Sequence, residues 1–470
     1  MANITLTDLN NYTRSLPSKR ITVDKIQSVG LFMALLSSFI HMPFDASDKI
    51  ELLIKTKTPI RGKAHGESKD MPTAGAPAFG KANVPLAELI DIAGITKQAM
   101  DRVTGMPGSW GSAVDMAIDD LLQISWQALL QFSTIGTGTG KLCRLVSAAQ
   151  VGSTAYVRCA SDSTYVDYGW DNVTQMYDGM LVEIYDSGLT TKRTASGGQE
   201  VSNVTPGRRS ASTYAAANGT FDIECADAST AATLAGQLAD NDVVYWHGTK
   251  SDGLGSGFPL PRGLFYFLQD GTHMSDQVQT GYFNLTRTDY NSLVARIYQA
   301  TDFGLSSESP ADGTPTFWDD SVIGDVCHDI KHGSGHGIVD TILVNDALGK
   351  CYGRMTKDKV TITLTSEQAA AGMRPALPRA PKVIEGPDGP INVISDEAIP
   401  ANCMILFDSH DAYMYQHGEF DWLRLFGDIW GPSKGDRKTD WEAPYGGYLQ
   451  FAWDRCDNMA LVQDLRSDCA

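Results

Sequence analysis

The chain has 470 residues, a formal net charge of −18, 42% hydrophobic residues and 20% charged residues. This length predicts two or three subdomains with separate cores, and the low charged content with abundant Gly favours strands, turns and extensive buried contacts. The acidic balance argues against a protein that wraps nucleic acid by itself, because phosphate neutralisation needs clustered Lys and Arg.

The N-terminal segment and the cysteines bear on location. Residues 1–16 are polar, and the apolar run at 30–40 has about half the length of a membrane span, so neither a signal peptide nor a membrane segment is predicted. The eight cysteines stand singly without a CxxC pair. They predict free, buried thiols in a chain made in a reducing compartment.

Residues 1–45 are interpreted as an N-terminal arm, in which helical apolar spacing continues into Leu35. Residues 46–90 begin with a strand pattern at Lys49–Lys57, followed by a Gly-, Pro- and Lys-rich stretch at 59–81. Because unstructured stretches longer than about 15 residues are uncommon inside compact domains, this segment predicts a projecting β-hairpin or an extended loop, with a solvated linker as the alternative. The basic residues expected at a subunit contact here are Lys55, Lys57, Arg61, Lys63 and Lys69.

Residues 91–150 contain the strongest helix pattern, with apolar residues at three- and four-residue steps from Val114 to Phe132. About 22 residues at 1.5 Å each predict a helix of roughly 33 Å, ending at a Gly-rich turn, Gly136–Lys141. Residues 151–248 form a separate pattern of short β-branched runs between Gly, Ser and Asn clusters, which predicts an inserted small β-barrel or sandwich. Its expected strands are Thr154–Cys159, Met180–Tyr185, Gly219–Cys225 and Asp242–Trp246.

Residues 249–412 predict a mixed domain with a helix at Thr316–Lys331 and strands at Ile338–Val344 and Ile399–Phe407. Residues 413–470 predict a late strand at Tyr448–Trp453, followed by the run Met459–Val462, and are rich in aromatic side chains. A sugar-binding platform is one interpretation of these aromatics, and core or subunit-interface packing is the commoner one. The predicted fold class is therefore α+β.

Three motifs suggest chemistry, and each has a structural interpretation that we prefer. Gly136–Lys141 lacks the first Gly and the final Ser or Thr of a nucleotide-binding P-loop. His328, His332 and His336 recur every four residues, as helical metal ligands can, but Gly333–Gly335 should end the helix before the third, so surface histidines are expected. The run Asp408–Asp411 combines carboxylates with an imidazole and predicts a turn at a strand end. No catalytic residue, metal site or cofactor is predicted.

The strand Asp340–Asn345 and the strand Ile399–Asp408, placed behind a long helix and a basic Gly/Pro-rich arm, resemble the major capsid proteins of tailed phages, with the Hong Kong 97-like fold. The resemblance covers nearly the whole chain apart from residues 151–248. It implies an N-terminal arm, an extended loop over a neighbouring subunit, a peripheral domain with a spine helix (91–150), an axial domain with a re-entry segment (249–412), and a C-terminal return to the peripheral domain (413–470).

This resemblance implies a structural, non-enzymatic protein that assembles with itself as hexamers and pentamers into an icosahedral head. The head would enclose double-stranded DNA without sequence-specific binding, form in the host bacterial cytoplasm, and become part of the virion. Scaffolding, portal and decoration proteins are the other implied partners, and no membrane is involved. Two alternatives remain open: an encapsulin-type compartment with the same fold, and a β-rich carbohydrate-binding or hydrolytic protein.

Overall fold

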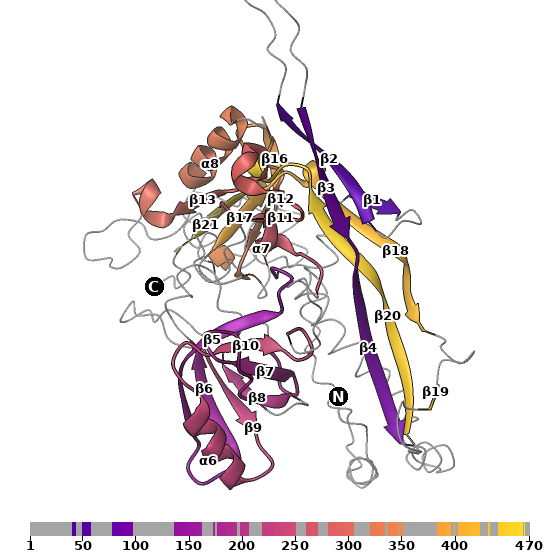
Figure 1. Cartoon of the computed structure of the whole chain (residues 1–470). Helices are drawn as coiled ribbons and strands as arrows, with labels where there is room; N and C mark the ends of the chain where they lie inside the picture. The colour runs from indigo at the N-terminus through magenta and orange to yellow at the C-terminus, as the bar shows by residue number, and fades with distance from the viewer. Residues whose placement is uncertain are drawn as a thin grey trace, which may run out of the picture.

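The computed structural model is mixed α and β and mostly β, in agreement with the predicted class (Figure 1). Among the described helices, none is long and apolar enough to cross a membrane. The structure describes residues 40–43, 49–57, 78–96, 136–161, 173, 176–194, 198–205, 219–250, 260–270, 281–304, 320–333, 337–346, 348–350, 383–395, 399, 403–423, 431–432, 440–463 and 465.

A two-stranded hairpin lies at the upper end of the molecule in Figure 1 and consists of β2 (Lys49–Lys57) and β3 (Ala78–Pro85). The bounds of β2 are those predicted from its alternating pattern. The hairpin is fixed to the body at one edge of β3, because the Asn284 side chain accepts from Asn83 N (2.6 Å) and donates to Lys81 O (3.0 Å). Asn284 lies between the short paired strands β11 (Gly281–Tyr282) and β12 (Leu285–Thr286).

A five-stranded sheet continues below the hairpin, with β20 at its centre. Its strands are β1 (Ile40–Pro43), β18 (Ala412–Trp422), β20 (Asp440–Trp453), β19 (Gly431–Pro432) and β4 (Ala87–Thr96). β4 and β20 run antiparallel from Ala87 to Thr96 and form the long ribbon in Figure 1. Gly446 of β20 permits their close approach, because a Cβ there would lie 2.3 Å from Leu89 O.

A six-stranded mixed sheet forms the second layer, in the order β13-β21-β17-β14-β16-β15. Its strands are β13 (Arg296–Gln299), β21 (Ala460–Gln463), β17 (Met404–Phe407), β14 (Thr341–Val344), β16 (Gly389–Ser395) and β15 (Val383–Gly386). The central strands read TILV, MILF and ALVQ, and all of their residues are buried. Such unbroken apolar runs fit a sheet that is covered on both faces.

Successive residues of these central strands do face different cores. Ile342 packs in a core with helix α8 (Asp320–His332), whereas Leu343 packs in the main core of the molecule. Leu406 and Phe407 of β17 divide in the same way. α8 contributes Val322, Ile323, Val326, Cys327 and Ile330 to its core.

The third unit is a closed six-stranded barrel in the order β10-β5-β6-β9-β8-β7. Its strands are β5 (Lys141–Gln150), β6 (Tyr156–Ser161), β7 (Leu181–Tyr185), β8 (Gln199–Thr205), β9 (Thr220–Glu224) and β10 (Val243–Trp246). Helix α6 (Ala228–Gln237) packs on β5 and β6 and begins at Asp227, whose carboxylate accepts from Thr230 N at 2.7 Å. The barrel begins at Lys141, before the start predicted at Val151, because β5 pairs with β10 and β6.

The chain enters and leaves the barrel through two segments that lie side by side. Trp246 N donates to Gly140 O (2.8 Å), and Leu260 N donates to Gly138 O (3.2 Å). Gly140 has φ +74°, and a Cβ on it would lie 2.3 Å from the Thr249 side chain. The Gly-rich turn at 136–140 therefore serves a close crossing of two chain segments and leads into a strand, unlike a P-loop.

Short helices connect the layers: α7 (Leu264–Phe267), η4 (Arg287–Asp289), η5 (Asn291–Leu293), η6 (Ala300–Phe303), η8 (Ser409–Asp411) and η9 (Cys456–Asn458). The segment around α7 is fully buried and brings Phe267 to 4.7 Å from Trp453, ring centre to ring centre. Trp453 lies in the core, as one interpretation of the C-terminal aromatics predicted.

Several sequence predictions have defined outcomes. The predicted helix Thr316–Lys331 corresponds to α8, and the run Met459–Val462 overlaps the strand β21. β21 joins the six-stranded sheet beside β13 and β17, whereas β18 and β20 join the other sheet, so residues 413–470 serve both. The predicted long helix at 114–132 and most of the N-terminal arm lie outside the described residues. Cys143, Cys159, Cys225, Cys327, Cys403 and Cys456 are free and buried as predicted, and Cys351 and Cys469 are outside the described part.

Candidate assembly surface

The β2–β3 hairpin has one buried face and one exposed face that carries large apolar side chains. Leu52 and Ile54 are buried, whereas Leu53 between them is 62% exposed. Phe79 is 58% exposed and lies diagonally across the hairpin from Leu53, because Leu53 pairs with Lys81 and Lys55 pairs with Phe79. The hairpin thus presents an apolar pair that its own fold does not cover.

Charges border this apolar pair. Lys81 Nζ lies 2.7 Å from Glu51 Oε2, and both side chains are exposed. Exposed ion pairs contribute little to stability, about 0–1 kcal/mol, so this pair is better suited to orienting a contact than to holding the hairpin. Lys55 and Lys57, predicted at the contact, belong to β2, while Arg61, Lys63 and Lys69 lie outside the described residues.

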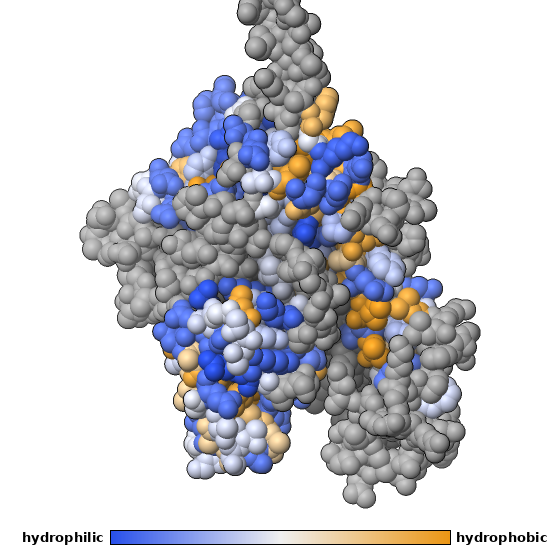
Figure 2. Space-filling model, in the orientation of Figure 1, coloured by the Kyte–Doolittle hydropathy of each residue, from blue (hydrophilic) through white to orange (hydrophobic). Residues whose placement is uncertain are grey.

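The ribbon of β4 and β20 has a similar face. Leu89 is buried, and the neighbouring Ile90 and Ile92 are 41% and 43% exposed, so they share the outward side of β4. Glu88 on the same side accepts from the Tyr448 hydroxyl of β20 at 3.1 Å. Figure 2 shows hydrophobic surface along this side of the molecule, near the hairpin and the ribbon.

Large exposed apolar side chains that gather on one side of a folded protein can mark an interaction surface. We use "assembly surface" for Leu53, Phe79, Ile90 and Ile92 together. These four residues were not identified from sequence, which drew attention to the neighbouring lysines. The sequence feature that could have identified them is that β2 and β4 each carry apolar residues at both odd and even positions, so that apolar side chains lie on both faces of the strand.

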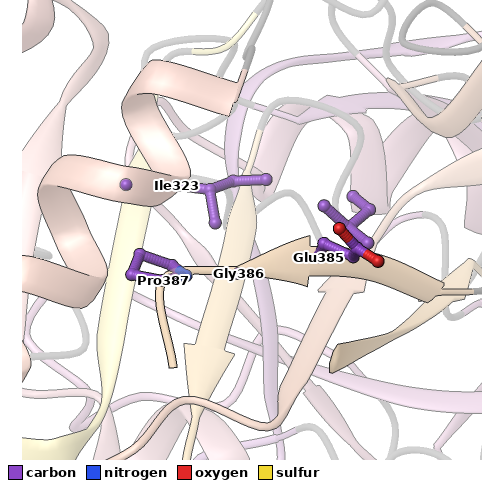
Figure 3. A pocket seen from close by; sticks show the side chains of 6 residues that line it. Ile323, Glu385, Gly386 and Pro387 are labelled. Atoms are coloured by element: carbon purple, nitrogen blue, oxygen red, sulfur yellow. The ribbon is translucent and has the colours of Figure 1, made fainter. Parts of the chain in front are cut away.

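A shallow pocket lies between α8 and the β15–β16 hairpin (Figure 3). Ile323 of α8 faces Gly386 and Pro387 of the hairpin turn, and the Glu385 side chain lies at the other end. The ion pair of Lys331 with Asp388 connects the helix to this turn. Few polar groups converge here, so the pocket has no evident chemistry.

Gly324 lies in the pocket wall, within helix α8, and its substitution is expected to change the stability of that helix. No atom lies within 4 Å of a Cβ built on it, so we expect Gly324→Ala to raise the free energy of unfolding by about 0.5–1 kcal/mol through helix propensity. Gly446→Ala is the control, because its Cβ would overlap the backbone carbonyl oxygen of Leu89, which cannot move aside, and the substitution should destabilise the protein. Urea denaturation of both variants measures the effect; a destabilised Gly324→Ala would contradict it.

The run Asp408–Asp411 forms a capped turn at the end of β17. The Ser409 hydroxyl donates to Asp340, and His410 Nδ1 lies 3.0 Å from Asp408 Oδ1. The hydroxyl therefore faces a carboxylate, where a hydrolytic triad would have it face an imidazole. Asp340, Asp408 and His410 could also hold a cation, but their hydrogen bonds already account for the turn.

Asp411 in this turn has a shifted pKa that makes the stability of the fold depend on pH. Burial raises its pKa to about 6, while the hydrogen bond from the Asn458 amide opposes the shift. A raised pKa means that the folded state holds its proton up to higher pH than the unfolded state. Stability from this group is therefore present below about pH 4, near the unfolded pKa, and is lost as the pH rises through 6.

We expect Asp411→Asn to remove this loss. Relative to the parent, the variant should gain about 1 kcal/mol of unfolding free energy between pH 4 and pH 7, a value discounted for partial exposure of the carboxyl. Asn keeps an oxygen that accepts from the Asn458 amide. Urea denaturation at several pH values checks this, and parallel pH profiles of parent and Asp411→Asn would disprove it.

A network of charged and polar groups around a buried carboxylate connects the end of the barrel to its wall. Glu183 of β7 is fully buried; its carboxylate accepts from Lys192 Nζ (2.9 Å) and Gly248 N (3.3 Å) and lies 2.7 Å from His247 Nδ1. This network ties the exit of the barrel to its wall. Polar satisfaction of this kind is typical of a structural network.

The sequence matches no family model and no curated protein. Solved structures with similar arrangements include the capsid of a native GTA particle (9% identity, TM-score 0.43, covering 98% of this chain and 99% of that chain) and the capsid of cyanophage A-1(L) (12%, 0.44, 96% and 99%). The encapsulin complex of Synechococcus elongatus is also similar (7%, 0.37, 100% and 98%). Over nearly its whole length, the chain is thus similar to capsid structures from a phage and a GTA particle.

Proposed function

We propose that this protein is a structural shell subunit with the Hong Kong 97-like fold, which assembles with copies of itself as hexamers and pentamers into an icosahedral phage head. The observation that carries the proposal is the assembly surface: two anchored β-ribbons expose large apolar side chains that the chain's own fold leaves uncovered. In this proposal a second copy of the chain covers these side chains, because most soluble oligomers are closed assemblies of identical subunits and rings form through head-to-tail contacts.

In this proposal, residues 46–90 are the extended loop, whose last residues enter β4. Through β4 the loop joins the sheet of β1, β18, β20, β19 and β4, which belongs to the peripheral domain. The six-stranded sheet with α8 is the axial domain, which approaches the centre of each hexamer or pentamer. The barrel is an inserted module at 141–248. The basic residues Lys55, Lys57, Arg61, Lys63 and Lys69 contribute charged contacts to the same subunit interface.

The net charge of −18 is compatible with a shell that contains DNA without binding it tightly, since an acidic chain does not neutralise phosphates. We therefore propose packaged double-stranded DNA as the content, assembly in the host cytoplasm, and contacts with scaffolding and portal proteins. An encapsulin-type compartment, which would enclose protein, is the second candidate because one similar structure is an encapsulin complex.

Electron microscopy and light scattering of the purified, expressed chain test the proposal. We expect capsomers or closed shells of uniform diameter, and a stable monomer over a wide concentration range would overturn it. Shells isolated from the native source should carry nuclease-protected DNA. Enclosed protein without DNA would instead support the compartment.

Replacing the barrel, residues 141–248, by a Gly-Ser linker is expected to leave the two sheets folded, because Gly140 and Thr249 already lie in contact and a short linker spans them. If the barrel contacts a neighbouring subunit, shells of the deletion variant should be less stable than parent shells. Circular dichroism and a cooperative urea transition check the fold, with the same linker inserted after Gly248 as control. An insoluble deletion variant would show that the barrel belongs to the main core.

A further inference from the structure

Two histidines lie one helical turn apart on the solvent face of α8. His328 and His332 are both exposed, and their ring centres are 4.2 Å apart with an angle of 50° between the planes. The opposite face of the helix is buried through Val322, Val326 and Ile330. This apolar face fixes the rotation of α8, so the fold itself sets both imidazoles side by side in water.

The residues next to this pair already have partners. Asp329 accepts from the Tyr298 hydroxyl at 2.9 Å, and Lys331 pairs with Asp388. Within the described part of the chain, neither His328 nor His332 makes a hydrogen bond or an ion pair, and each ring contacts the other. The fold therefore uses the neighbouring side chains and leaves the imidazole nitrogens available to a ligand.

We propose that His328 and His332 together bind a divalent transition-metal ion such as Zn²⁺, Ni²⁺ or Cu²⁺. Two imidazoles at i and i+4 on one helix face can share a metal, as in metalloprotease helices, and water can complete the coordination. Imidazole selects these ions over Mg²⁺ and Ca²⁺, which prefer oxygen ligands.

The spacing in the sequence predicted surface histidines only, and the ring-to-ring contact on a fixed helix face is the added observation. The inference is independent of the proposed shell function, because it depends on one helix of one subunit. A shell would repeat the site once for every subunit.

The test is titration of the full-length protein with NiCl₂ and with ZnCl₂ by calorimetry, without any affinity tag. We expect one equivalent to bind per chain, and His328→Ala or His332→Ala to weaken binding at least about tenfold. Cu²⁺ electron paramagnetic resonance should report two nitrogen ligands in the parent. MgCl₂ should give no binding.

His410→Ala is the matched control, because His410 is also exposed but belongs to the Asp340–Asp408 turn. It should leave the affinity unchanged. Unchanged affinity in the double variant His328→Ala/His332→Ala would overturn the proposal. Loss of binding in His410→Ala would do so too, by placing the ion in the turn. Circular dichroism confirms that the variants are folded.

Discussion

Leu53→Asp combined with Phe79→Asp is expected to abolish shell assembly while each subunit still folds. Both side chains are more than half exposed in the single chain, so the substitutions remove little packing from the subunit. Burying two such side chains at a contact contributes about 1.5–3 kcal/mol each, and burying carboxylates there instead adds a penalty. The association constant should therefore fall more than about 100-fold.

Sedimentation velocity of the variant beside the parent measures this effect, and circular dichroism confirms its fold. The matched comparison is Glu51→Gln, on the same exposed face, which should weaken assembly far less than the double variant because it removes a charge but no apolar contact. A companion variant with Lys55, Lys57, Arg61 and Lys63 all changed to Glu tests the charged part of the contact. If the double variant Leu53→Asp/Phe79→Asp formed shells like those of the parent, the hairpin would not be part of the assembly surface.

Arg287→Ala is expected to have the largest effect on the stability of the folded subunit. Arg287 is fully buried, and its guanidinium donates to the carbonyl oxygens of Tyr266 and Leu293. The same group lies 5.3 Å from the Tyr266 ring centre and 5.4 Å from that of Tyr282. The guanidinium therefore contacts α7 through Tyr266, η5 through Leu293 and β11 through Tyr282.

The substitution would leave two buried carbonyls without a donor and open a cavity, so we expect a loss of about 3–5 kcal/mol of unfolding free energy. Arg287→Met, which fills more of the space but cannot donate, should lose about 2–3 kcal/mol. Lys81→Ala, at an exposed ion pair, is the control and should change stability by less than about 1 kcal/mol. Urea unfolding of subunits measures all three, and equal stability of parent and Arg287→Ala would contradict the role assigned to Arg287.

The sequence predicted those helices and strands whose apolar residues have a clear periodic spacing along the chain. The alternation in Lys49–Lys57 predicted β2 with its observed bounds, and the helical spacing of Ile323, Val326 and Ile330 predicted α8. β8 and α6 were missed. The sequence Gln199–Thr205 is mostly polar with half-buried residues, and Ala228–Gln237 has only two buried residues, so neither gave a clear period.

The sequence by itself therefore determined the class of the fold, the hairpin strand, the separate β-rich module and the free state of the six described cysteines, because these depend on local periodicity, turn residues and spacing. Only the tertiary structure decided that β5 closes the barrel and that β21 leaves the C-terminal ribbon for the six-stranded sheet. It also decided which apolar residues of β2 and β4 stay uncovered. These outcomes depend on pairing between segments far apart in the chain, which local periodicity does not encode.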